Sequence, residues 1–360
     1  MKLRIGIVTF HRAINYGAVL QTYALLKTLE SIEPDASICV VDYTNRVIKK
    51  NDRIVFLRPI CKSRFVKDIV ANFTQLIRFW SGYILRLRFR KFVETYVAPE
   101  SVINLDAFDL IIYGSDQIWN PIITGHDKVY FGFGYKGKKV SYAASDGGRW
   151  VHDDDAITYL RGFLHISCRE RTLTEKLRLI LPEMNIETVC DPVFLVDLQE
   201  WMKITVPVRD ADYILVYKLS ENSNIEAEAL ALGERLGKKV VMLDYSFSLR
   251  SVFFNGINRR IAVSPQTFVS YFLNASAVIT NSFHGAVFSI VFRKPFASLQ
   301  LDMGGERITD LLTTIGLESR WVQSVENLSF DGKLYDSDVE RRIYEYRDHS
   351  LQYLRNCLID

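Results

Sequence analysis

The stretch AVITNSFHGAVFSIVF, at residues 277–292, has the pattern of a strand that runs directly into a helix. Its first four residues are apolar or β-branched and predict a buried strand. Residues 281–284 then form a turn, and Gly285 opens an apolar helix. A strand followed at once by a helix is the repeating unit of α/β proteins with parallel sheets.

The same alternation of short apolar runs and helical patterns recurs along the whole chain. It predicts strands at residues 3–10, 38–43, 110–113, 139–144, 165–168, 188–190, 213–217, 240–244, 277–280 and 296–299. It predicts helices at residues 18–30, 73–94, 225–236, 265–274, 286–292, 307–315 and about 337–357. The pattern restarts after a polar, strand-poor seam near residues 201–212. We therefore expect an α/β fold with two Rossmann-like domains facing a cleft.

This pattern divides the chain into three parts. An N-terminal Rossmann-like domain is expected at residues 1–203, with a basic helical insertion at about 46–94. A second Rossmann-like domain is expected at 204–330. A C-terminal helix, within residues 331–360, is expected to pack back on the first domain.

Length and composition exclude several classes of protein. The 360 residues are too many for a minimal binding module, and 48% hydrophobic with 24% charged residues excludes collagen, a long disordered region and a coiled coil. The five cysteines are odd in number and widely spaced, which argues against a disulfide framework or a zinc site and favours a reducing cytoplasm. The N-terminus does not have the pattern of a signal peptide, and no apolar run reaches membrane-spanning length.

Positive charge is concentrated in residues 46–91, which hold 13 Lys and Arg but only two acids. Within this segment, aromatic and aliphatic residues recur at helical spacing among the arginines. Such a helix fits an anionic membrane surface, as at the inner membrane face. It equally fits a long surface helix packed on its own domain, with arginine stems covering the edge of the core. A nucleic-acid partner is not expected, because nothing else in the chain matches a nucleic-acid-binding module.

Ligands of parallel sheets lie beyond the carboxyl ends of the strands, and three basic side chains occupy such positions. His284 stands at a helix start, where an imidazole can act as general acid or base or bind a phosphate. Arg169 directly follows a strand and opens a helix, which favours a carboxylate or phosphate ligand, the alternative being a structural ion pair. Arg307 also stands at a helix start. Their neighbours Glu170, Asn281, Ser282 and Gly285 are candidates for the same site.

Polar and aromatic residues follow two strands of the first half. Asp116 and Trp119 resemble a sugar-binding pair, in which the carboxylate accepts hydroxyl hydrogen bonds and the ring stacks on C–H groups. The alternative is that Asp116 caps a helical turn and Trp119 lies in the core. The further candidates for hydroxyl-rich ligands are Asn15, Tyr16, Gln21 and Ser115.

Six segments, taken in order, resemble the polysaccharide pyruvyl transferase family. They are IGIVTFHRAINYGAVLQTYAL, IIYGSDQIWNP, SYAAS, SCRE, VCDPVFLV and TNSFHGAVFSIVFRKPF. The resemblance implies a two-domain fold like that of GT-B glycosyltransferases. It also implies transfer of a pyruvyl group from phosphoenolpyruvate to a sugar, giving a cyclic ketal during assembly of an exopolysaccharide or capsule. Phosphoenolpyruvate would be a co-substrate, with no cofactor or metal, and the acceptor would be a sugar or a lipid-linked oligosaccharide.

The resemblance also assigns roles to residues. His284 would move a proton or contact phosphate, Arg169 would hold the anionic donor with help from Arg307, and the first half would hold the acceptor. Some branches of the family carry an arginine two residues before the histidine, where this chain has Ser282. Lys294 or Arg307 would then supply the missing cation, or the donor would differ. A GT-B-type glycosyltransferase using a nucleotide sugar and a non-catalytic glycan-binding subunit are therefore kept as alternatives.

Overall fold

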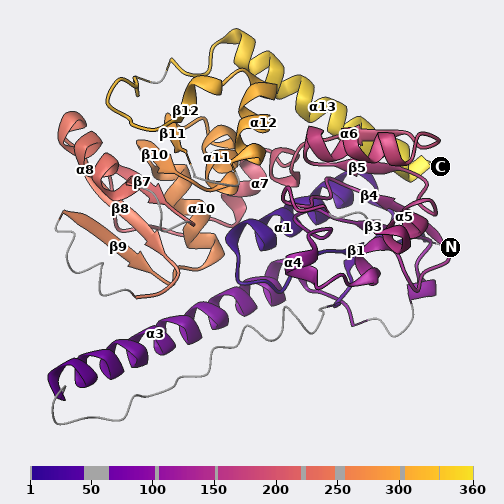
Figure 1. Ribbon diagram of the computed structural model, residues 1–360, viewed down its shortest axis with the longest axis horizontal. Coiled ribbons are helices and arrows are strands. Elements are labelled where there is room, and N and C mark those ends of the chain that lie inside the picture. The colour runs from indigo at the N-terminus through magenta and orange to yellow at the C-terminus, as the bar shows by residue number, and fades with distance from the viewer. Residues whose placement is uncertain are drawn as a thin grey trace.

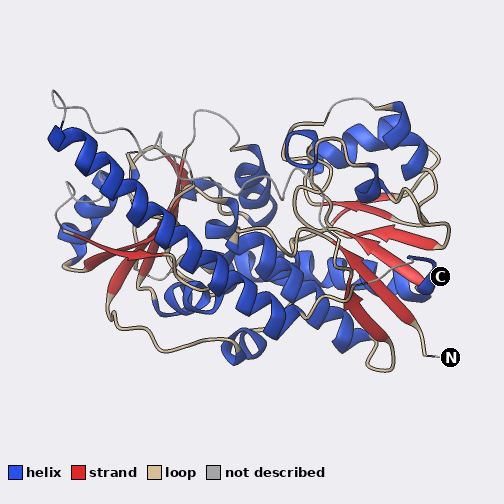
Figure 2. Ribbon diagram, turned by 90° about the horizontal axis from the view of Figure 1, so that it is seen from below, coloured by secondary structure: helices blue, strands red, loops and turns tan. Residues whose placement is uncertain are grey.

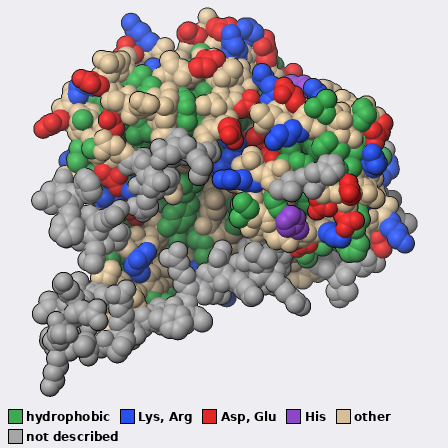
Figure 3. Space-filling view, in the orientation of Figure 1, with side chains coloured by type: hydrophobic (Ala, Val, Ile, Leu, Met, Phe, Trp, Pro, Cys, Tyr) green, Lys and Arg blue, Asp and Glu red, His purple; other side chains and the backbone are tan. Residues whose placement is uncertain are grey.

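The computed structural model describes residues 2–43, 65–101, 105–150, 153–219, 224–247, 256–300, 305–331 and 333–359, with the backbone alone for 65–71. It shows an α/β protein with two separate parallel sheets, one in each half of the chain (Figures 1 and 2). Helices surround both sheets, and the two chain ends lie beside the N-terminal sheet. In the space-filling view, charged side chains of both signs are interspersed over the described surface (Figure 3).

The N-terminal sheet has the strand order β2-β1-β3-β4, and all its strands are parallel. A separate parallel pair, β5-β6, is joined to it by single bridges at Val140–His165 and Ala144–Cys168. The strands are β1 (Arg4–Val8), β2 (Ser37–Val40), β3 (Leu110–Tyr113), β4 (Lys138–Ser141), β5 (Ile166–Cys168) and β6 (Ile186–Thr188). The predicted strands agree with these to within three residues, because β1, β3 and β5 are almost wholly buried and so read as continuous apolar runs.

The C-terminal sheet has the order β12-β11-β10-β7-β8-β9, also parallel throughout. Its first strand in the chain, β7, lies next to β10, so the winding direction reverses between these two strands. The strands are β7 (Tyr213–Tyr217), β8 (Lys239–Asp244), β9 (Ile257–Ile261), β10 (Ala277–Thr280), β11 (Phe296–Leu299) and β12 (Trp321–Val322). The two edge strands were not predicted from the sequence, because β9 carries two arginines and β12 has only two residues.

The predicted helices are all present. Those longer than eight residues are α1 (Tyr16–Ile32), α3 (Phe65–Phe92), α6 (Arg171–Ile180), α8 (Ile225–Leu236), α10 (Pro265–Asn274), α11 (Phe283–Val291), α12 (Glu306–Ile315) and α13 (Ser337–Ile359). The shorter ones are α4 (Pro121–Thr124), α5 (Asp154–Leu160) and α7 (Leu198–Lys203). α1 and α11 begin two and three residues earlier than predicted, because Asn15 and Ser282 cap them from just outside.

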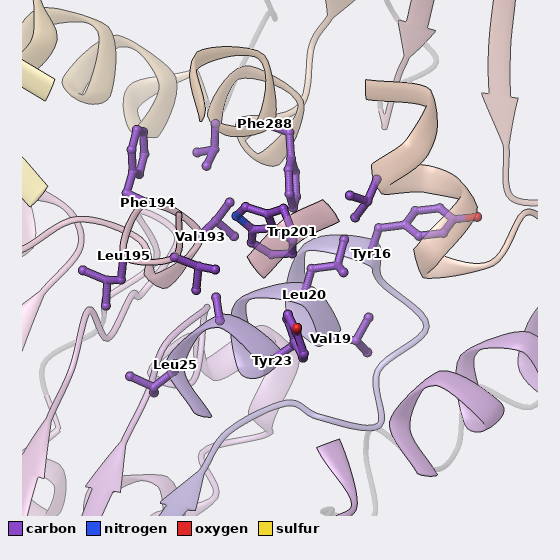
Figure 4. Close-up of a cluster of buried hydrophobic side chains, with 14 of the residues drawn as sticks. Tyr16, Val19, Leu20, Tyr23, Leu25, Val193, Phe194, Leu195, Trp201 and Phe288 are labelled. Carbon is purple, nitrogen blue, oxygen red and sulfur yellow. The ribbon is translucent and has the colours of Figure 1, made fainter. Parts of the chain in front are cut away.

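A shared hydrophobic core joins the two halves (Figure 4). From α1, the Tyr16 ring stacks on Phe268 of α10, with centroids 4.4 Å apart and planes 10° apart. Trp201 of α7 packs against Phe288 of α11, with centroids 5.3 Å apart. Because these large side chains are fully buried, the packing fixes how the strand ends of the two sheets face each other.

Helix α13 returns from the C-terminal half to the N-terminal half, above both sheets in Figure 1. The hydroxyl of Tyr353 donates to the carbonyl of Ser141, at the end of β4. The backbone N–H of Cys190 donates to the hydroxyl of Ser350. These contacts attach α13 to the end of β4 and to the segment that follows β6. The domain limits at residues 203 and 330 stay a prediction.

Among the described residues, helix α3 forms the lower edge in Figure 1, and it crosses the side that faces the viewer in Figure 2. It starts eight residues earlier than predicted, and residues 46–64 of the expected insertion lie outside the described residues. Its inner face is buried, and Phe89 packs against the Tyr16 ring at 4.9 Å. None of the described helices is long and apolar enough to cross a membrane.

Candidate functional site

Arg169 forms the centre of a buried cluster of charges where the two halves meet. It directly follows β5, and its Nη1 donates to Oδ2 of Asp191 at 2.9 Å. Its Nε donates to Oε1 of Glu170 at 3.3 Å, and its Nη2 lies 3.8 Å from Oδ1 of Asp116. Only 4% of Arg169 is exposed. One buried guanidinium therefore neutralises part of the charge of three carboxylates.

His284 reaches the same carboxylate from the other half of the chain. Its Nε2 lies 3.4 Å from Oδ2 of Asp191, the oxygen that Arg169 also contacts. The opposite edge of the imidazole faces Gly17 in the first turn of α1, where a Cβ atom would come within 2.0 Å of Nδ1. A ring held between Gly17 and Asp191 has little freedom to turn.

The cluster perturbs the pKa values of its members in opposite directions. Burial by itself raises the pKa of Asp191, but the contacts with His284 and Arg169 outweigh it and lower that pKa to about 2. Burial also raises the pKa of Glu170, and here Arg169 and Ser145 only partly compensate. Asp191 therefore stays ionised at neutral pH, whereas Glu170 is a carboxyl group whose charged form is disfavoured.

A second guanidinium lies beside the first. The guanidinium carbons of Arg169 and Arg307 lie 4.5 and 5.8 Å from the centre of the Phe283 ring, within the range of cation–π contacts. Burial and the nearby Arg169 lower the pKa of Arg307. Among the described residues, Arg307 donates no hydrogen bond, and Nη2 of Arg169 and Nε2 of His284 are buried without a hydrogen-bond partner. Unpaired buried donors of this kind fit an anionic ligand.

The turn at residues 281–285 orients the imidazole of His284. The Ser282 hydroxyl accepts a hydrogen bond from the Gly285 N–H at 3.4 Å, and the Asn281 side chain accepts one from the Leu219 N–H at 2.9 Å. A Cβ atom on Gly285 would come within 2.0 Å of the Thr280 hydroxyl. These three residues lie at the site, but the contacts they make hold the turn in shape.

Lys294 is excluded as the replacement for the missing arginine. It lies beyond the C-terminal end of α11, where its N–H donates to the Ser289 carbonyl. His284 lies at the N-terminal end of the same helix. Of the two cations considered from the sequence, only Arg307 is near the cluster, through its contact with Phe283.

The candidate acceptor residues divide into two groups. Asp116 belongs to the charge cluster through Arg169, and Ser115 supports it by donating from its hydroxyl to the Ala143 carbonyl at 3.0 Å. Asn15 is half-buried and accepts from the N–H of Ala18 as the cap of α1. A role for these three residues in acceptor binding stays a prediction.

The other three acceptor candidates are corrected by the structure. Trp119 is 1% exposed, its indole N–H donates to the Tyr130 carbonyl, and its ring stacks on Phe131, so it cannot form a sugar platform with Asp116. Tyr16 is 1% exposed in the shared core, and its hydroxyl donates to the Val263 carbonyl. Gln21 is fully buried and donates to the Thr9 hydroxyl. The core alternative therefore holds for Trp119.

Asp191 was not predicted from the sequence, although it joins Arg169 and His284 in the cluster. Asp191 follows β6 and accepts a hydrogen bond from the N–H of Val193 through its second oxygen. The signal was present, because the segment VCDPVFLV places an acidic residue just after a strand. In the part of the chain that the structure describes, no group of three or more His, Cys, Asp and Glu side chains could hold a metal ion.

The fold defines a structural class. It is similar to the GT-B-like fold, in which two Rossmann-like halves face each other. One similar structure is the UDP-GlcNAc 2-epimerase from Neisseria meningitidis bound to UDP-GlcNAc, with 11% identity, full coverage of both chains and a TM-score of 0.51. Another, provisionally named a UDP-N-acetylglucosamine 2-epimerase from Listeria monocytogenes, has 9% identity and a TM-score of 0.52 over 98% of this chain and 91% of that one. At such low identity, these similarities show the fold alone.

Within this class the chain belongs to the polysaccharide pyruvyl transferase family, whose model matches residues 15–302. The matched segment runs from the cap of α1 past β11 and includes Arg169, Asp191 and His284. The match confirms the resemblance seen in the sequence and supports a transferase. No curated protein sequence matches the chain.

Proposed function

We propose that this protein transfers a pyruvyl group from phosphoenolpyruvate to two hydroxyls of a sugar in a nascent cell-surface polysaccharide, forming a cyclic ketal. The observation that carries this proposal is the meeting of Arg169 and His284 on Oδ2 of Asp191, with Nη2 of Arg169 left without a hydrogen-bond partner and Arg307 near the same Phe283 ring. Phosphoenolpyruvate carries a carboxylate and a phosphate, which charge-assisted hydrogen bonds from such donors recognise.

In this proposal His284 moves the proton through Nε2, which lies 3.4 Å from Asp191 without a hydrogen bond to it, whereas its Nδ1 edge faces Gly17. Nε2 gives a proton to the methylene carbon of the donor, which leaves positive charge at C2. One sugar hydroxyl attacks C2 and returns a proton to the imidazole. The second hydroxyl then bonds to C2 while the bond from C2 to the phosphate oxygen breaks, and the phosphate leaves with the electron pair and the second proton.

Asp191 positions the imidazole in this scheme. Because its pKa is about 2, it is an anion throughout the neutral range and stabilises a protonated imidazole beside it. Its second contact, with Arg169, fixes the carboxylate. The buried charges are oriented before the donor arrives, so little reorganisation is needed when charge develops during the reaction.

Arg169 and Arg307 hold the anionic donor in this scheme. Nη2 of Arg169 has no hydrogen-bond partner, and Arg307 donates no hydrogen bond among the described residues. The two guanidinium groups lie near the same Phe283 ring, so one dianion can reach both. Arg307 thereby takes the place of the arginine that some branches of the family carry at the position of Ser282.

The acceptor sugar is expected to approach from the N-terminal half, past Asp116. This carboxylate is 6% exposed and keeps only a loose contact of 3.8 Å with Arg169, so it can accept a hydrogen bond from a sugar hydroxyl. Ser115 and Asn15 lie on the same half. A cytoplasmic location fits this donor, and the described cysteines Cys39, Cys168, Cys190 and Cys357 are free thiols.

One observation favours a second candidate, a glycosyltransferase that uses a nucleotide sugar. Ser282 stands where an arginine would otherwise face the donor, and its hydroxyl is used to cap α11. A site with one cation fewer suits a donor whose charge lies on a diphosphate that helix N-termini can bind. The two candidates differ in which ligand stabilises the free protein.

Melting-temperature measurements with phosphoenolpyruvate and with UDP-GlcNAc distinguish the pyruvyl transferase from the glycosyltransferase. A ligand at about 100 times its Kd stabilises the folded protein by about 2.7 kcal/mol. We expect phosphoenolpyruvate to raise the melting temperature and UDP-GlcNAc to leave it unchanged. A rise with UDP-GlcNAc and none with phosphoenolpyruvate would contradict the pyruvyl transferase proposal and support the glycosyltransferase.

Transfer itself is tested with radiolabelled phosphoenolpyruvate and lipid-linked oligosaccharides extracted from bacterial membranes. We expect label to enter the lipid fraction with release of one phosphate per pyruvyl group. His284→Gln should lose this transfer while still showing stabilisation by phosphoenolpyruvate. A protein that binds the glycan and transfers nothing from either donor would be the non-catalytic subunit.

A further inference from the structure

Helix α3 carries an exposed apolar surface, which we call the outer stripe. Its central residues follow one another at spacings of three and four along the helix, so they share one face. Each is between 41 and 63% exposed, although large apolar side chains are usually buried. The outer stripe consists of Phe73, Leu76, Phe79, Trp80, Tyr83, Ile84 and Leu87.

The opposite face of α3 is fixed to the rest of the molecule. Leu85 and Phe89 are 4% and 3% exposed, and the Ser81 hydroxyl accepts a hydrogen bond from the N–H of Phe247. Arg88 donates from its guanidinium to the Ala262 carbonyl. Because these contacts hold the helix, it cannot rotate to bury the outer stripe against its own domain.

The charges around the outer stripe are almost all positive. Between residues 73 and 92 the sequence has five basic residues and no acid. Arg90 and Lys91 follow Leu87 at spacings of three and four and are exposed, and the next acid, Glu94, pairs with Arg90 at 2.9 Å. A second copy of the chain docked on the stripe would bring like charges together, whereas an anionic surface would complement them.

We propose that the outer stripe docks this protein on an anionic lipid bilayer, with α3 lying in the plane of the interface. An apolar face that contains Trp and Tyr and is flanked by Arg and Lys is typical of interfacial helices. The stripe spans 14 residue steps, about 21 Å at 1.5 Å per residue. Among the described residues, α3 forms the lower edge of the molecule in Figure 1.

This docking explains why the apolar side chains stay exposed in the isolated chain. Insertion of the outer stripe buries it in the acyl boundary, and the basic residues contact anionic headgroups, each worth about 1 kcal/mol or roughly fivefold in binding. The proposal concerns location and does not depend on the reaction that the protein catalyses. Of the two interpretations of the basic helix, the proposal favours membrane binding over a purely structural role.

Flotation of the full-length protein with vesicles tests the proposal. We expect binding to vesicles that contain phosphatidylglycerol, weaker binding to pure phosphatidylcholine, and loss of binding as salt rises. The double variant Trp80→Glu/Leu87→Glu should reduce binding at least about tenfold, and Arg90→Gln/Lys91→Gln should do so on the anionic vesicles. All four side chains are exposed, so these variants should keep the melting temperature of the wild type.

Leu179→Glu is the matched control, because Leu179 is 84% exposed and lies on α6, away from the outer stripe. It should bind vesicles as the wild type does. Equal binding by all variants, or no vesicle binding by the wild type, would overturn the proposal. A concentration-dependent dimer that Trp80→Glu/Leu87→Glu abolishes, with no vesicle binding, would show that a second copy covers the stripe.

Discussion

Gly17 lies directly against the imidazole of His284, although the two residues come from different halves of the chain. A Cβ atom at position 17 would come within 2.0 Å of Nδ1 and within 2.3 Å of Cγ and Cε1. No side chain fits in this space unless the imidazole moves. The first turn of α1 thus sets where His284 stands relative to Asp191.

Gly17→Ala should therefore displace the imidazole and reduce turnover. A misplacement of about 1 Å at a reacting group can lower kcat about a hundredfold, and we expect a loss of that order. The measurement is kcat for transfer from phosphoenolpyruvate. Gly82→Ala is the control, since a Cβ atom there meets nothing within 4 Å, and it should leave kcat unchanged. Equal activity of both variants would remove His284 from the reaction.

Asp191→Asn should lower both activity and stability. The substitution removes a buried anion that contacts Arg169 and His284, and breaking one partner of a buried ion pair costs about 3–5 kcal/mol. Urea unfolding measures the loss. The control Asp155→Asn removes an exposed carboxylate that pairs with Lys128, and it should change the free energy of unfolding by less than about 1 kcal/mol.

Glu170 predicts a pH dependence of stability. Its pKa is raised in the folded protein, so its contribution to stability is full below its unfolded pKa and is lost as the pH rises through its folded value. Glu170→Gln cannot ionise and avoids this loss. The free energy of unfolding of Glu170→Gln relative to wild type should therefore increase between about pH 4.5 and neutral pH.

Asp191 affects the pH dependence of stability in the opposite direction. Its pKa of about 2 is below its ordinary value of 3.8, so its contribution is present above about pH 4 and is lost as the pH falls toward 2. Urea unfolding of wild type and Glu170→Gln at several pH values separates the two effects, because Asp191 is fully ionised over the upper range. A difference that stays constant with pH would contradict a raised pKa for Glu170.

The fold could be predicted from the sequence because its strands are short, apolar and buried on both sides. The strands at 110–113, 213–217, 277–280 and 296–299 and the helices α8 and α10 have the predicted bounds. The edge strand β9, with Arg259 and Arg260 among its five residues, lacks that signal. The exposure of the outer stripe of α3 could not be predicted either, because helical spacing does not reveal which apolar face is covered.

The candidate site could be predicted only in part, because it depends on contacts between distant segments. Arg169 and His284 were found because each follows a strand, and their meeting depends on Asp191, 22 residues beyond the arginine. Trp119 also follows a strand and has the chemistry of a sugar platform. Its burial beneath Phe131 depends on a loop that packs over it, which no local pattern indicates.

Trp119→Phe tests whether this tryptophan is structural. The change leaves the buried Tyr130 carbonyl without its donor, so the free energy of unfolding should fall by about 1–3 kcal/mol while the KM for the acceptor stays constant. Trp80→Phe is the control, because Trp80 is 58% exposed, and its stability should match the wild type. A raised KM for the acceptor with unchanged stability would restore Trp119 to the acceptor site.

Substitution of Arg169 and of Arg307 should affect stability differently, because, among the described residues, Arg169 forms ion pairs with carboxylates and Arg307 does not. Arg169 contacts three carboxylates, so Arg169→Ala should destabilise the fold as well as reduce turnover. Arg307 donates no hydrogen bond to the described residues, so Arg307→Gln should keep the free energy of unfolding within about 1 kcal/mol of wild type.

Arg307→Gln should nevertheless raise the KM for phosphoenolpyruvate at least about tenfold, because a charge-assisted hydrogen bond contributes about 1.5–3 kcal/mol. Steady-state kinetics and the shift in melting temperature with phosphoenolpyruvate both measure this loss. Arg171→Gln is the matched control, since Arg171 is half exposed and pairs loosely with Asp310 at 3.9 Å on the neighbouring helix. If Arg307→Gln binds phosphoenolpyruvate like the wild type, Arg307 does not bind the donor. Of the two arginines, only Arg169 would then bind it, and no residue would replace the arginine that some family branches carry at the position of Ser282.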